Sequence, residues 1–490
     1  MWKRIKSFLF ENKTSKQTVA KNTVWLSISN FGGRLIKAII VIYGARVLGA
    51  AGYGVFSYAV TLAGLFAIFI DLGINSILIR DGAKTSPDER QRLFSTTLLM
   101  KVILMAAVII FIVTVAPYFS TLPGARVLLP FVALMTVFDG MREFLSSLFR
   151  AEEKMQWDAA AFLASNIAVV FFGFIFLRIA ATPFSFTGAY ALGTAVGAFV
   201  AVLFLRNRFK KVFSGVSLKR MGIILKSAWP FAIISALGVL LTSSDILIIS
   251  WMKSASDVGI YSAGIRIIQL LYIIPTIIQL STLPILSRLT KGDPGKFRLA
   301  FEKIFSLVFL VSLPISLGGA ILGAQIMGLV FGNAYVVGGM ALSILMLGIS
   351  IDYAGGVISN SVFVRDHQKS LITCTAIAGV ANILFDLLLI PRWGMAGSAM
   401  ATLIALILSN SYLWYVAKKL SNFSFLPYIK RICGAGIIMA ATTALLYAAG
   451  INVIANVLIS GAVYILALLL LKEPLLREVK EVVALGSAEA

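Results

Sequence analysis

Long apolar runs, separated by short polar turns, follow one another along the whole chain. A helix needs about 20 mainly apolar residues to cross a bilayer. Fourteen runs meet this length: 22–48, 53–79, 93–117, 126–149, 159–180, 184–205, 224–250, 258–283, 302–325, 338–363, 370–390, 396–417, 428–449 and 451–471. They are too long and continuous for the alternating strands of a membrane β-barrel. The pattern therefore predicts an all-α polytopic membrane protein.

Composition and charge placement support this prediction. The 490 residues are 59% hydrophobic and 13% charged, which is typical of a membrane protein and not of a water-soluble one. The net charge of +22 could suggest a nucleic-acid partner, but 33 of the 43 Lys and Arg residues fall in turns on one side and five on the other. Basic residues gather on the cytoplasmic side of membrane proteins. We therefore expect cytoplasmic termini and no nucleic-acid partner.

Short stretches of the chain resemble one another in order. "KNTVW" at 21–25 aligns with "KSAWP" at 226–230, and "GYGVFSYA" at 52–59 aligns with "DVGIYSAG" at 257–264, both at an offset near 205. The charged turn "SLFRAEEK" from 147 likewise matches "SVFVRDHQK" from 361. The matches indicate a parallel duplication of six helices, with two further helices appended.

The duplication suggests five segments. Two six-helix lobes of this kind are a common transporter plan, with the substrate site between the lobes and alternating access by rocking. The N-terminal segment, with apolar residues at helical spacing among basic ones, fits a helix lying on the inner membrane surface. The segments are 1–21, a basic amphipathic start; 22–205, the N-lobe; 206–226, a basic cytoplasmic connector; 227–417, the C-lobe; and 418–490, helices 13 and 14 with a cytoplasmic tail.

Residues suited to covalent chemistry or metal binding are scarce. The chain has two cysteines, Cys374 and Cys433, and one histidine, His367. This excludes a disulfide framework or a metal cluster of Cys and His. Loops are too short for a soluble domain, which weakens the case for a membrane glycosyltransferase or polymerase. We predict no catalytic residue, no metal and no cofactor, so the protein is not expected to be an enzyme.

Three stretches carry a resemblance to a known family. They are "ARVLGAAGYGVFSYAVTLAGLFAIFIDLGINSILIRDGAK" at 45–84, "SSDILIISWMKSASDVGIYSAGIRI" at 243–267 and "ANILFDLLLIPRWGMAGSAMATLIA" at 381–405. They resemble the polysaccharide-transport flippases, the Wzx-like O-antigen and exopolysaccharide flippases of the multidrug/oligosaccharidyl-lipid/polysaccharide exporter superfamily. The resemblance covers essentially the whole chain, including the plan of six, six and two helices.

The resemblance implies a multidrug-exporter-like fold and a location in the cell membrane. It also implies movement of an undecaprenyl-pyrophosphate-linked oligosaccharide from the inner to the outer leaflet, for polysaccharide biosynthesis. The expected partners are this lipid-linked oligosaccharide, membrane lipids and other polysaccharide-assembly proteins.

Five cations lie inside the predicted spans: Arg34, Lys37, Lys101, Arg142 and Arg266. A charge at the bilayer centre costs about 2.5–3.5 kcal/mol on insertion scales, so it persists facing a wet or protein-lined interior. Arg34 and Lys37 lie at mid-depth and share a helix face. Such cations can replace water around a lipid diphosphate, and Arg142 and Arg266 are further candidates for the same headgroup. Lys101 lies near a cytoplasmic helix end and is expected to snorkel.

Acidic residues also occur within the spans. Asp71, Asp245, Asp352 and Asp386 lie in spans 2, 7, 10 and 11, and Asp139 and Glu143 flank Arg142 in span 4. Each either pairs with an intramembrane cation or binds a coupling ion, H⁺ or Na⁺. The group around Arg142 is either a neutralised structural pair or part of the binding site. Asp386 either forms a polar patch with Asn382, four residues earlier, or is solvated near the outer end of its span.

Prolines interrupt several spans. Pro230 opens span 7, Pro275 interrupts span 8 and Pro314 interrupts span 9. Such breaks are tolerated where neighbouring groups satisfy the freed backbone. Each is either a static kink or a hinge.

Three alternatives to the lipid-linked oligosaccharide flippase remain. A multidrug/cation antiporter of the same superfamily would favour an acidic cavity and usually twelve helices, which the intramembrane cations argue against. A flippase for the peptidoglycan lipid precursor also has fourteen helices and a cationic cavity, and only the motifs disfavour it. A membrane glycan polymerase or ligase would act catalytically on lipid-linked sugar without transporting it.

Overall fold

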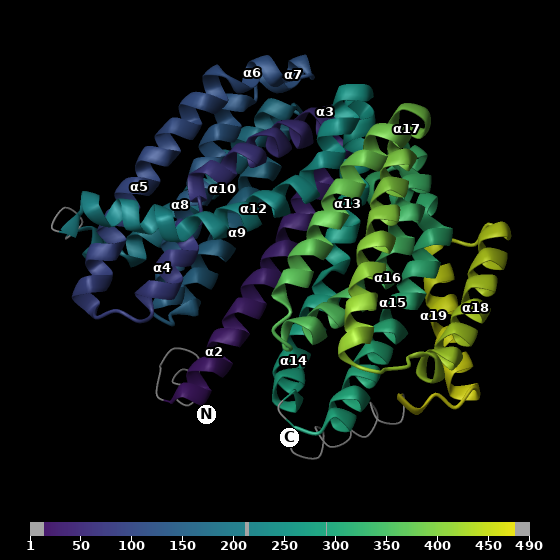
Figure 1. Cartoon of the computed structure of the whole chain (residues 1–490). Helices are drawn as coiled ribbons and strands as arrows, with labels where there is room; N and C mark the ends of the chain where they lie inside the picture. The colour runs from purple at the N-terminus through teal and green to yellow at the C-terminus, as the bar shows by residue number, and fades with distance from the viewer. Residues whose placement is uncertain (1–13, 211–214, 291, 476–490) are drawn as a thin grey trace, which may run out of the picture. The chain divides into compact units, whose positions relative to one another are not determined.

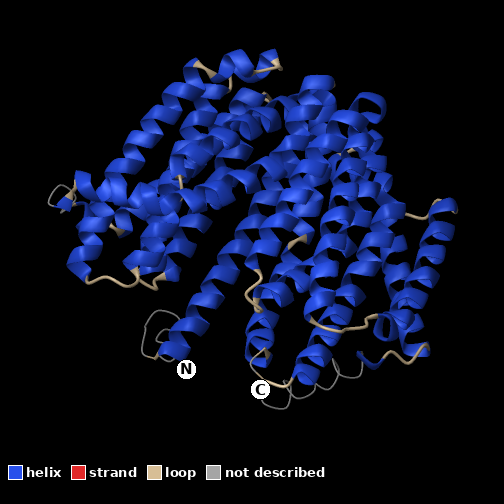
Figure 2. Ribbon diagram, in the orientation of Figure 1, coloured by secondary structure: helices blue, strands red, loops and turns tan. Residues whose placement is uncertain are grey.

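The computed structural model describes residues 14–210, 215–290 and 292–475, and these residues are helical with short loops and no strand (Figure 2). The chain divides into two compact units, Met1–Gly259 and Ile260–Ala490. The predicted surface helix falls mostly on residues 1–13, which lie outside the described residues.

The first unit holds the helices up to the start of α13 (Figure 1). A π-helical turn, η1, links α2 to α3, and three very short helices lie in turns. The elements are α2 Ser15–Ser27, η1 Ile28–Gly32, α3 Gly33–Asp71, α4 Ile74–Gly82, α5 Pro87–Thr114, α6 Ala116–Phe119, α7 Pro123–Arg126, α8 Leu129–Ala151, α9 Met155–Ile179, α10 Pro183–Phe204, α11 Arg206–Phe209, α12 Leu218–Met252 and α13 Ala255–Leu271.

The second unit begins within α13 and holds the remaining helices (Figure 1). These are α14 Ile273–Leu289, α15 Pro294–Phe331, the 3₁₀ helix η3 Asn333–Gly338, α16 Gly339–Phe363, α17 Gln368–Leu420, α18 Leu426–Ala448 and α19 Val453–Leu470.

The helices account for the fourteen predicted spans. By length and composition, 11 helical segments in the described part of the chain can cross a membrane. Two of them, α3 and α17, are each two helices joined at a kink, where Gly49 (φ 67°) and Gly394 (φ 55°) leave the helical conformation. The 23-residue α8 is also long enough, although it carries four charged side chains. The prediction of an all-α polytopic membrane protein with about fourteen spans is confirmed.

Two glycines at equivalent repeat positions contact each other within the first unit. A Cβ added to Gly54 would lie 1.8 Å from the carbonyl oxygen of Ala255, and one added to Gly259 would lie 1.9 Å from that of Ala50. Both pairs of positions are separated by the offset of 205 seen in the sequence repeat. The helices α3 and α13 therefore cross backbone against backbone, which only glycine permits here.

The compact first unit extends beyond the first predicted lobe because α12 packs on α3, α4 and α5. The closest approach is at Gly73, whose added Cβ would lie 2.4 Å from the carbonyl oxygen of Ala228. The boundary between compact units is thus at Gly259, whereas the sequence repeat suggested a boundary in the 206–226 connector.

Two predicted spans are each divided into two helices. In the second span, α3 ends at Asp71 and α4 begins at Ile74, with Leu72 (φ 44°) and Gly73 (φ 79°) both in the left-handed region. In the eighth span, α13 ends at Leu271 and α14 begins at Ile273.

Proline explains two carbonyl groups that bond outside their own helix. Because proline has no N–H, the carbonyl group four residues earlier loses its helical partner. Pro314 frees the carbonyl of Leu310, which accepts a 2.9 Å hydrogen bond from the hydroxyl of Tyr464 on α19. Pro275 stands four residues after Leu271, whose carbonyl accepts a hydrogen bond from the hydroxyl of Tyr353 on α16.

The last two helices pack against α15. A core of Met439 and Leu468 with Tyr464 is buried against Leu313 and Leu317 of α15. A Cβ on Gly436 would lie 2.6 Å from the Leu313 side chain, so α18 lies very close to α15. The Tyr464 hydrogen bond therefore links α19 to α15 inside an apolar contact.

Replacing Tyr464 should show how much stability is lost when the Leu310 carbonyl, freed by Pro314, has no hydrogen-bond partner. Tyr464→Phe leaves the Leu310 carbonyl without a partner, and the expected loss is about 1 kcal/mol, seen as a lower thermal transition in detergent. Adding Pro314→Ala should restore stability, because alanine supplies the missing N–H. Tyr447→Phe, on the exposed face of α18, is the control. Equal effects of Tyr464→Phe with and without Pro314→Ala would contradict this explanation.

Candidate functional site

Two cations stand exposed within the first membrane-spanning segment. Arg34 and Lys37 lie near the start of α3, and both side chains are exposed. Next to Arg34, Gly33 allows α3 to approach α9, because an added Cβ would lie 2.4 Å from the Phe162 ring. A charge exposed to hydrocarbon is costly, so these side chains must face water or a polar ligand.

Arg34 differs from the other intramembrane cations in its surroundings. No ion pair within the described ranges includes Arg34. The ammonium of Lys37, three residues later, lies 5.2 Å from the centre of the Tyr190 ring, a cation–π distance. The Arg34 guanidinium is thus available to a ligand.

A ladder of alternating charges runs along α8 and ends on α9. Arg142 Nη2 lies 2.9 Å from Asp139 Oδ1 and 3.4 Å from Glu143 Oε2. Arg150 continues the ladder, with Nη1 2.7 Å from Glu143 Oε1 and Nε 2.7 Å from Asp158 Oδ2. The side chain of Asp139 is 56% exposed, whereas that of Arg142 is 5% exposed. Both cations of the ladder, the buried Arg142 and the partly exposed Arg150, are therefore neutralised by carboxylates.

This arrangement separates two groups among the predicted headgroup ligands. Arg142 is buried, pairs with two carboxylates and lies 5.0 Å from the centre of the Phe162 ring, which favours a structural role. Arg266, half-buried on α13, donates a 2.8 Å hydrogen bond to Gln269 on the same helix. Arg34 and Lys37 remain the better candidates for contact with a diphosphate.

Lys101 does not snorkel to the membrane surface, contrary to the expectation from its depth. Its side chain is 1% exposed, and Nζ lies 2.8 Å from Asp71 Oδ1 and 3.0 Å from Asn75 Oδ1. The reason is the break in the second span, which brings these two side chains to α5. Sequence reasoning missed Asn75, although a glycine in mid-span two residues after Asp71 was a usable signal.

Acidic side chains in the second unit are also partnered by neighbours. Asp386 is fully buried, with Oδ2 3.4 Å from Asn382 Nδ2, so it is not solvated as one of the two expectations held. Asp352 on α16 is half-buried and bonds to the hydroxyl of Tyr272, at the break of the eighth span.

The remaining predicted acid, Asp245, belongs to the first unit. It lies on α12, buried next to Ser243 and Ser244. Across the described residues no group of three or more His, Cys, Asp or Glu side chains could hold a metal ion. A coupling ion would therefore have to be held by single carboxylates together with hydroxyl, amide or backbone oxygens.

A second charged cluster, at the α8–α9 turn, was not anticipated from the sequence. The Glu152 side chain is 5% exposed and lies 2.5 Å from Arg208 Nη2 and 2.7 Å from Lys154 Nζ. Burial acts to raise the pKa of Glu152, but the ion pairs with Lys154 and Arg208 outweigh it and hold the pKa below its usual range. The cluster ties the short helix α11 to the α8–α9 turn.

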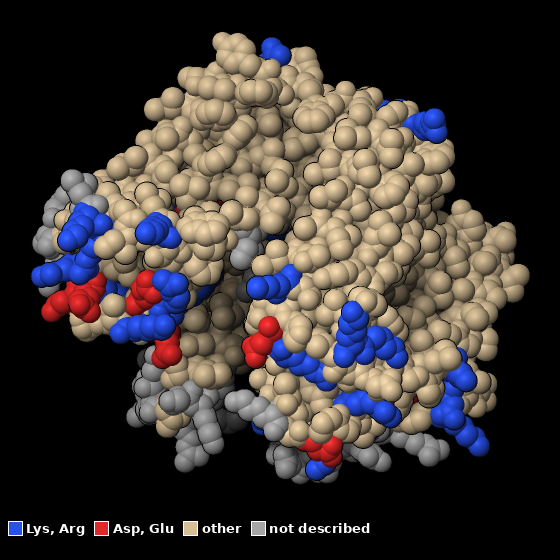
Figure 3. All heavy atoms as spheres, viewed as in Figure 1, with Lys and Arg blue, Asp and Glu red and all other residues tan. Residues whose placement is uncertain are grey.

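The distribution of charge matches the helical spans. In Figure 3, the visible Lys and Arg side chains gather mostly toward one end of the helices, and the rest of the visible surface carries few.

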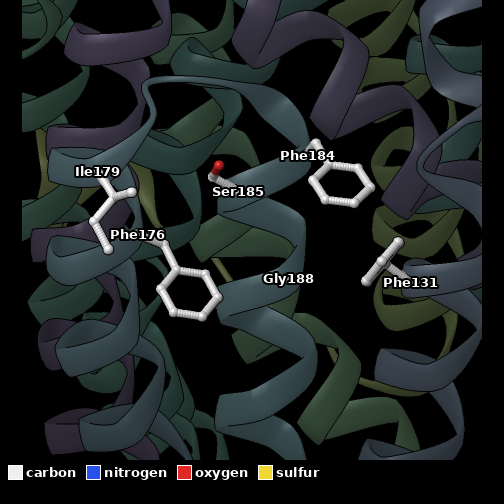
Figure 4. Close-up of a pocket in the computed structure, with 6 residues that line it drawn as sticks. All are labelled: Phe131, Phe176, Ile179, Phe184, Ser185 and Gly188. Carbon is white, nitrogen blue, oxygen red and sulfur yellow. The ribbon is translucent and has the colours of Figure 1, made fainter.

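An apolar pocket lies between the start of α8, the end of α9 and the start of α10. It is lined by Phe131, Phe176, Ile179, Phe184, Ser185 and Gly188, and Figure 4 shows the three phenylalanine rings around α10. No ionisable side chain lines it, so this pocket is unsuited to a diphosphate.

Fold and site together define a multi-pass helical membrane protein with charged groups placed inside its spans. Residues 19–290, more than half of the chain, match the family described as "Polysaccharide biosynthesis protein". The chain belongs to this family.

Individual relatives agree with this assignment. The chain is 24% identical over 427 residues to a putative O-antigen transporter of Shigella flexneri, covering 83% of this chain and 99% of that protein. Its fold is similar to the inward closed conformation of the lipid II flippase MurJ, with a TM-score of 0.76, 17% identity and coverage of 92% and 100%. It is also similar to an inward-facing multidrug resistance MATE transporter of the MOP superfamily, with a TM-score of 0.64, 16% identity and coverage of 81% and 97%.

The charge ladder should matter for stability. Arg150→Ala leaves the buried carboxylate of Asp158 without its cation, whereas Glu143 keeps its pair with Arg142. Losing the partner of a buried carboxylate costs about 3 kcal/mol. We expect a marked drop in the thermal transition in detergent. Arg80→Ala, which removes the exposed pair with Asp81, should change stability by less than about 1 kcal/mol. Equal transitions for the two variants would show that the ladder is not structural.

Proposed function

We propose that the protein is a flippase that moves an undecaprenyl-pyrophosphate-linked oligosaccharide from the inner to the outer leaflet. The observation that carries the proposal is the exposed guanidinium of Arg34, which has no carboxylate partner in the described ranges, with the exposed ammonium of Lys37 one turn away. Arg34 lies within a span, where a positive charge without a carboxylate partner needs an anionic ligand or water.

The chemistry of the cargo fits these two cations. A diphosphate loses its hydration on entering the membrane, and charge-assisted hydrogen bonds from protein cations replace that hydration. An arginine binds phosphate oxygens with two parallel N–H groups, whereas lysine acts as a flexible point charge. Arg34 would hold the headgroup, and the flexible Lys37 side chain would stay in contact with it during the conformational change.

Movement of the cargo would follow the alternating-access plan of duplicated transporters. The lobes 22–205 and 227–417 would rock about a central cationic site, with the connector 206–226 and both termini on the cytoplasmic side of the cell membrane. The excess of Lys and Arg in the turns on that side supports this orientation. No bond of the cargo needs to break, so the proposed activity is transport and not catalysis.

Two alternatives share the fold. A multidrug/cation antiporter would bind cations, and exposed Arg34 and Lys37 would repel them. A flippase for the peptidoglycan lipid precursor would use the same diphosphate chemistry. The match to the polysaccharide biosynthesis family and to an O-antigen transporter favours a cargo for polysaccharide assembly. Other polysaccharide-assembly proteins are the expected partners.

Removing the Arg34 guanidinium should stop transport without unfolding the protein. Arg34→Ala removes a ligand to the diphosphate but no ion pair, so we expect normal yield and thermal stability with transport reduced at least about 100-fold, the size of a lost charged contact of about 3 kcal/mol. Arg34→Lys should retain part of the activity, and Lys37→Ala should be milder. Transport is measured with lipid-linked oligosaccharide in proteoliposomes.

A surface cation provides the matched control for this experiment. Lys84→Ala removes an exposed positive charge from the turn after α4 and should transport normally. Full transport by a well-expressed Arg34→Ala protein would refute the role of this residue. Loss of yield or stability in Arg34→Ala would instead indicate a structural role.

We further propose that a buried acid couples export to a gradient of H⁺ or Na⁺. Asp245 is a buried carboxylate within a span, where an acidic side chain can hold a coupling ion. Asp245→Asn should reduce transport driven by an imposed ion gradient several-fold and leave binding of the lipid-linked oligosaccharide within about twofold, because Asp245 is not among the proposed ligands of the cargo. Binding and gradient-driven uptake are measured on the same preparation. Unchanged transport across a range of gradients would exclude coupling through Asp245.

A further inference from the structure

The break in the second span is enclosed on one side by α12. Leu72 and Gly73 are both left-handed, and the carbonyl oxygen of Ala228 on α12 would lie 2.4 Å from a Cβ at Gly73. A break at this place leaves backbone groups of α3 and α4 without helical partners. The chain must therefore satisfy them by other means.

Asp71 supplies one of the missing backbone interactions, and Lys101 binds the side chains on both sides of the break. The carboxylate oxygen Oδ1 of Asp71 accepts a 3.2 Å hydrogen bond from the N–H of Asn75, in the first turn of α4. The same oxygen lies 2.8 Å from Lys101 Nζ, which also donates to Asn75 Oδ1 at 3.0 Å. A carboxylate is favourable at a helix N-terminus. One ammonium group of α5 thus binds the residue before the break and a residue after it.

Lys101 also contacts α8, the helix that carries most of the charge ladder. Its ammonium lies 5.8 Å from the centre of the Phe144 ring on α8, and Phe144 follows Arg142 and Glu143 directly in sequence. The helix α4 itself packs against α8 as well as α5. The position of the half-helix α4 and the position of α8 are therefore coupled through this side chain.

Exposure distinguishes Lys101 from a ligand of the cargo. The side chain of Lys101 is 1% exposed, whereas that of Asp71 is 28% exposed. A diphosphate cannot reach the buried ammonium without displacing Asp71. Lys101 therefore acts through the residues it holds.

The eighth span shows a comparable arrangement in the second unit. It is broken at Tyr272, whose hydroxyl bonds to Asp352 of α16, and the Leu271 carbonyl accepts a hydrogen bond from Tyr353 of the same helix. The second and eighth spans correspond in the sequence repeat. Interrupted helices in corresponding positions of two repeats point to the moving parts around a transport site.

We propose that Lys101 is a positioning residue that fixes the break of the second span. It holds α4 on α5 and α8, and so keeps α8 and its charge ladder in place during transport. The part of this proposal that concerns transport rests on the proposed function. The part that concerns the position of α4 does not.

The experiment measures the position of α4 directly. In a background with Cys374 and Cys433 replaced by serine, Arg80→Cys on α4 and Leu99→Cys on α5 receive spin labels, and the distance distribution is recorded by pulsed electron resonance in proteoliposomes. Lys101→Met is compared with the parent protein. Val102→Ala, on the exposed face of α5 beside Lys101, is the matched control.

We expect one narrow distance population in the parent and in the Val102→Ala control, and a broader or shifted one with Lys101→Met. Transport turnover of Lys101→Met should fall about tenfold or more, because breaking a buried ion pair changes the structure around it, while binding of the lipid-linked oligosaccharide changes less than about threefold. Lys101→Arg should recover part of the turnover, since it keeps the charge.

Lys101→Met leaves the Asp71 charge unpaired, so it is accompanied by the double variant Lys101→Met/Asp71→Leu, which removes both charges. A broadened distribution together with reduced turnover in the folded double variant supports the proposal. An unchanged distribution in the folded double variant, or a changed distribution with normal turnover, would overturn it. If the proposed cargo were wrong, Arg34→Ala would transport normally while the spin-label result still reported the position of α4.

Discussion

Hydrocarbon offers no hydrogen-bond partner, so every polar group that this chain carries into the membrane must find one in the protein or in water. The backbone meets this constraint by being helical, and where proline or a break interrupts a helix, a side chain from a neighbouring helix takes over. Tyr464 and Tyr353 do so for the carbonyls of Leu310 and Leu271. At the break of the second span, Asp71 accepts a hydrogen bond from the N–H of Asn75, and Lys101 of α5 binds the side chains of both residues. The positions at which the helices are interrupted thus determine some of the contacts between helices.

Because of the same constraint, charged side chains inside the spans are informative. The ladder from Asp139 to Asp158 pairs each of its cations with carboxylates, and so needs no outside ligand. Arg34, by contrast, is exposed and has no such partner in the ranges described. A guanidinium at that depth is stable beside water or an anion, which links the physical chemistry of the span to the chemistry of a lipid diphosphate.

The architecture could be predicted from the sequence because it depends on a property of long segments. Apolar runs, glycine kinks and basic turns are each visible along the chain, and the fourteen spans follow from them. Partners of single side chains are different. Depth along its helix suggested that Lys101 would snorkel, but its burial is decided by Asp71 and Asn75, 30 and 26 residues away. Asp386 lies near a span end and yet is fully buried, because burial depends on the neighbouring helices.

The close contact of Gly54 with Gly259 bears on how the protein is made. The first compact unit includes α12 and the first turn of α13, so it is complete only when residue 259 has entered the membrane and the second repeat has already begun to emerge. Domains generally fold in order during synthesis. Until then, α3, α4 and α5 lack the surface of α12 that packs on them.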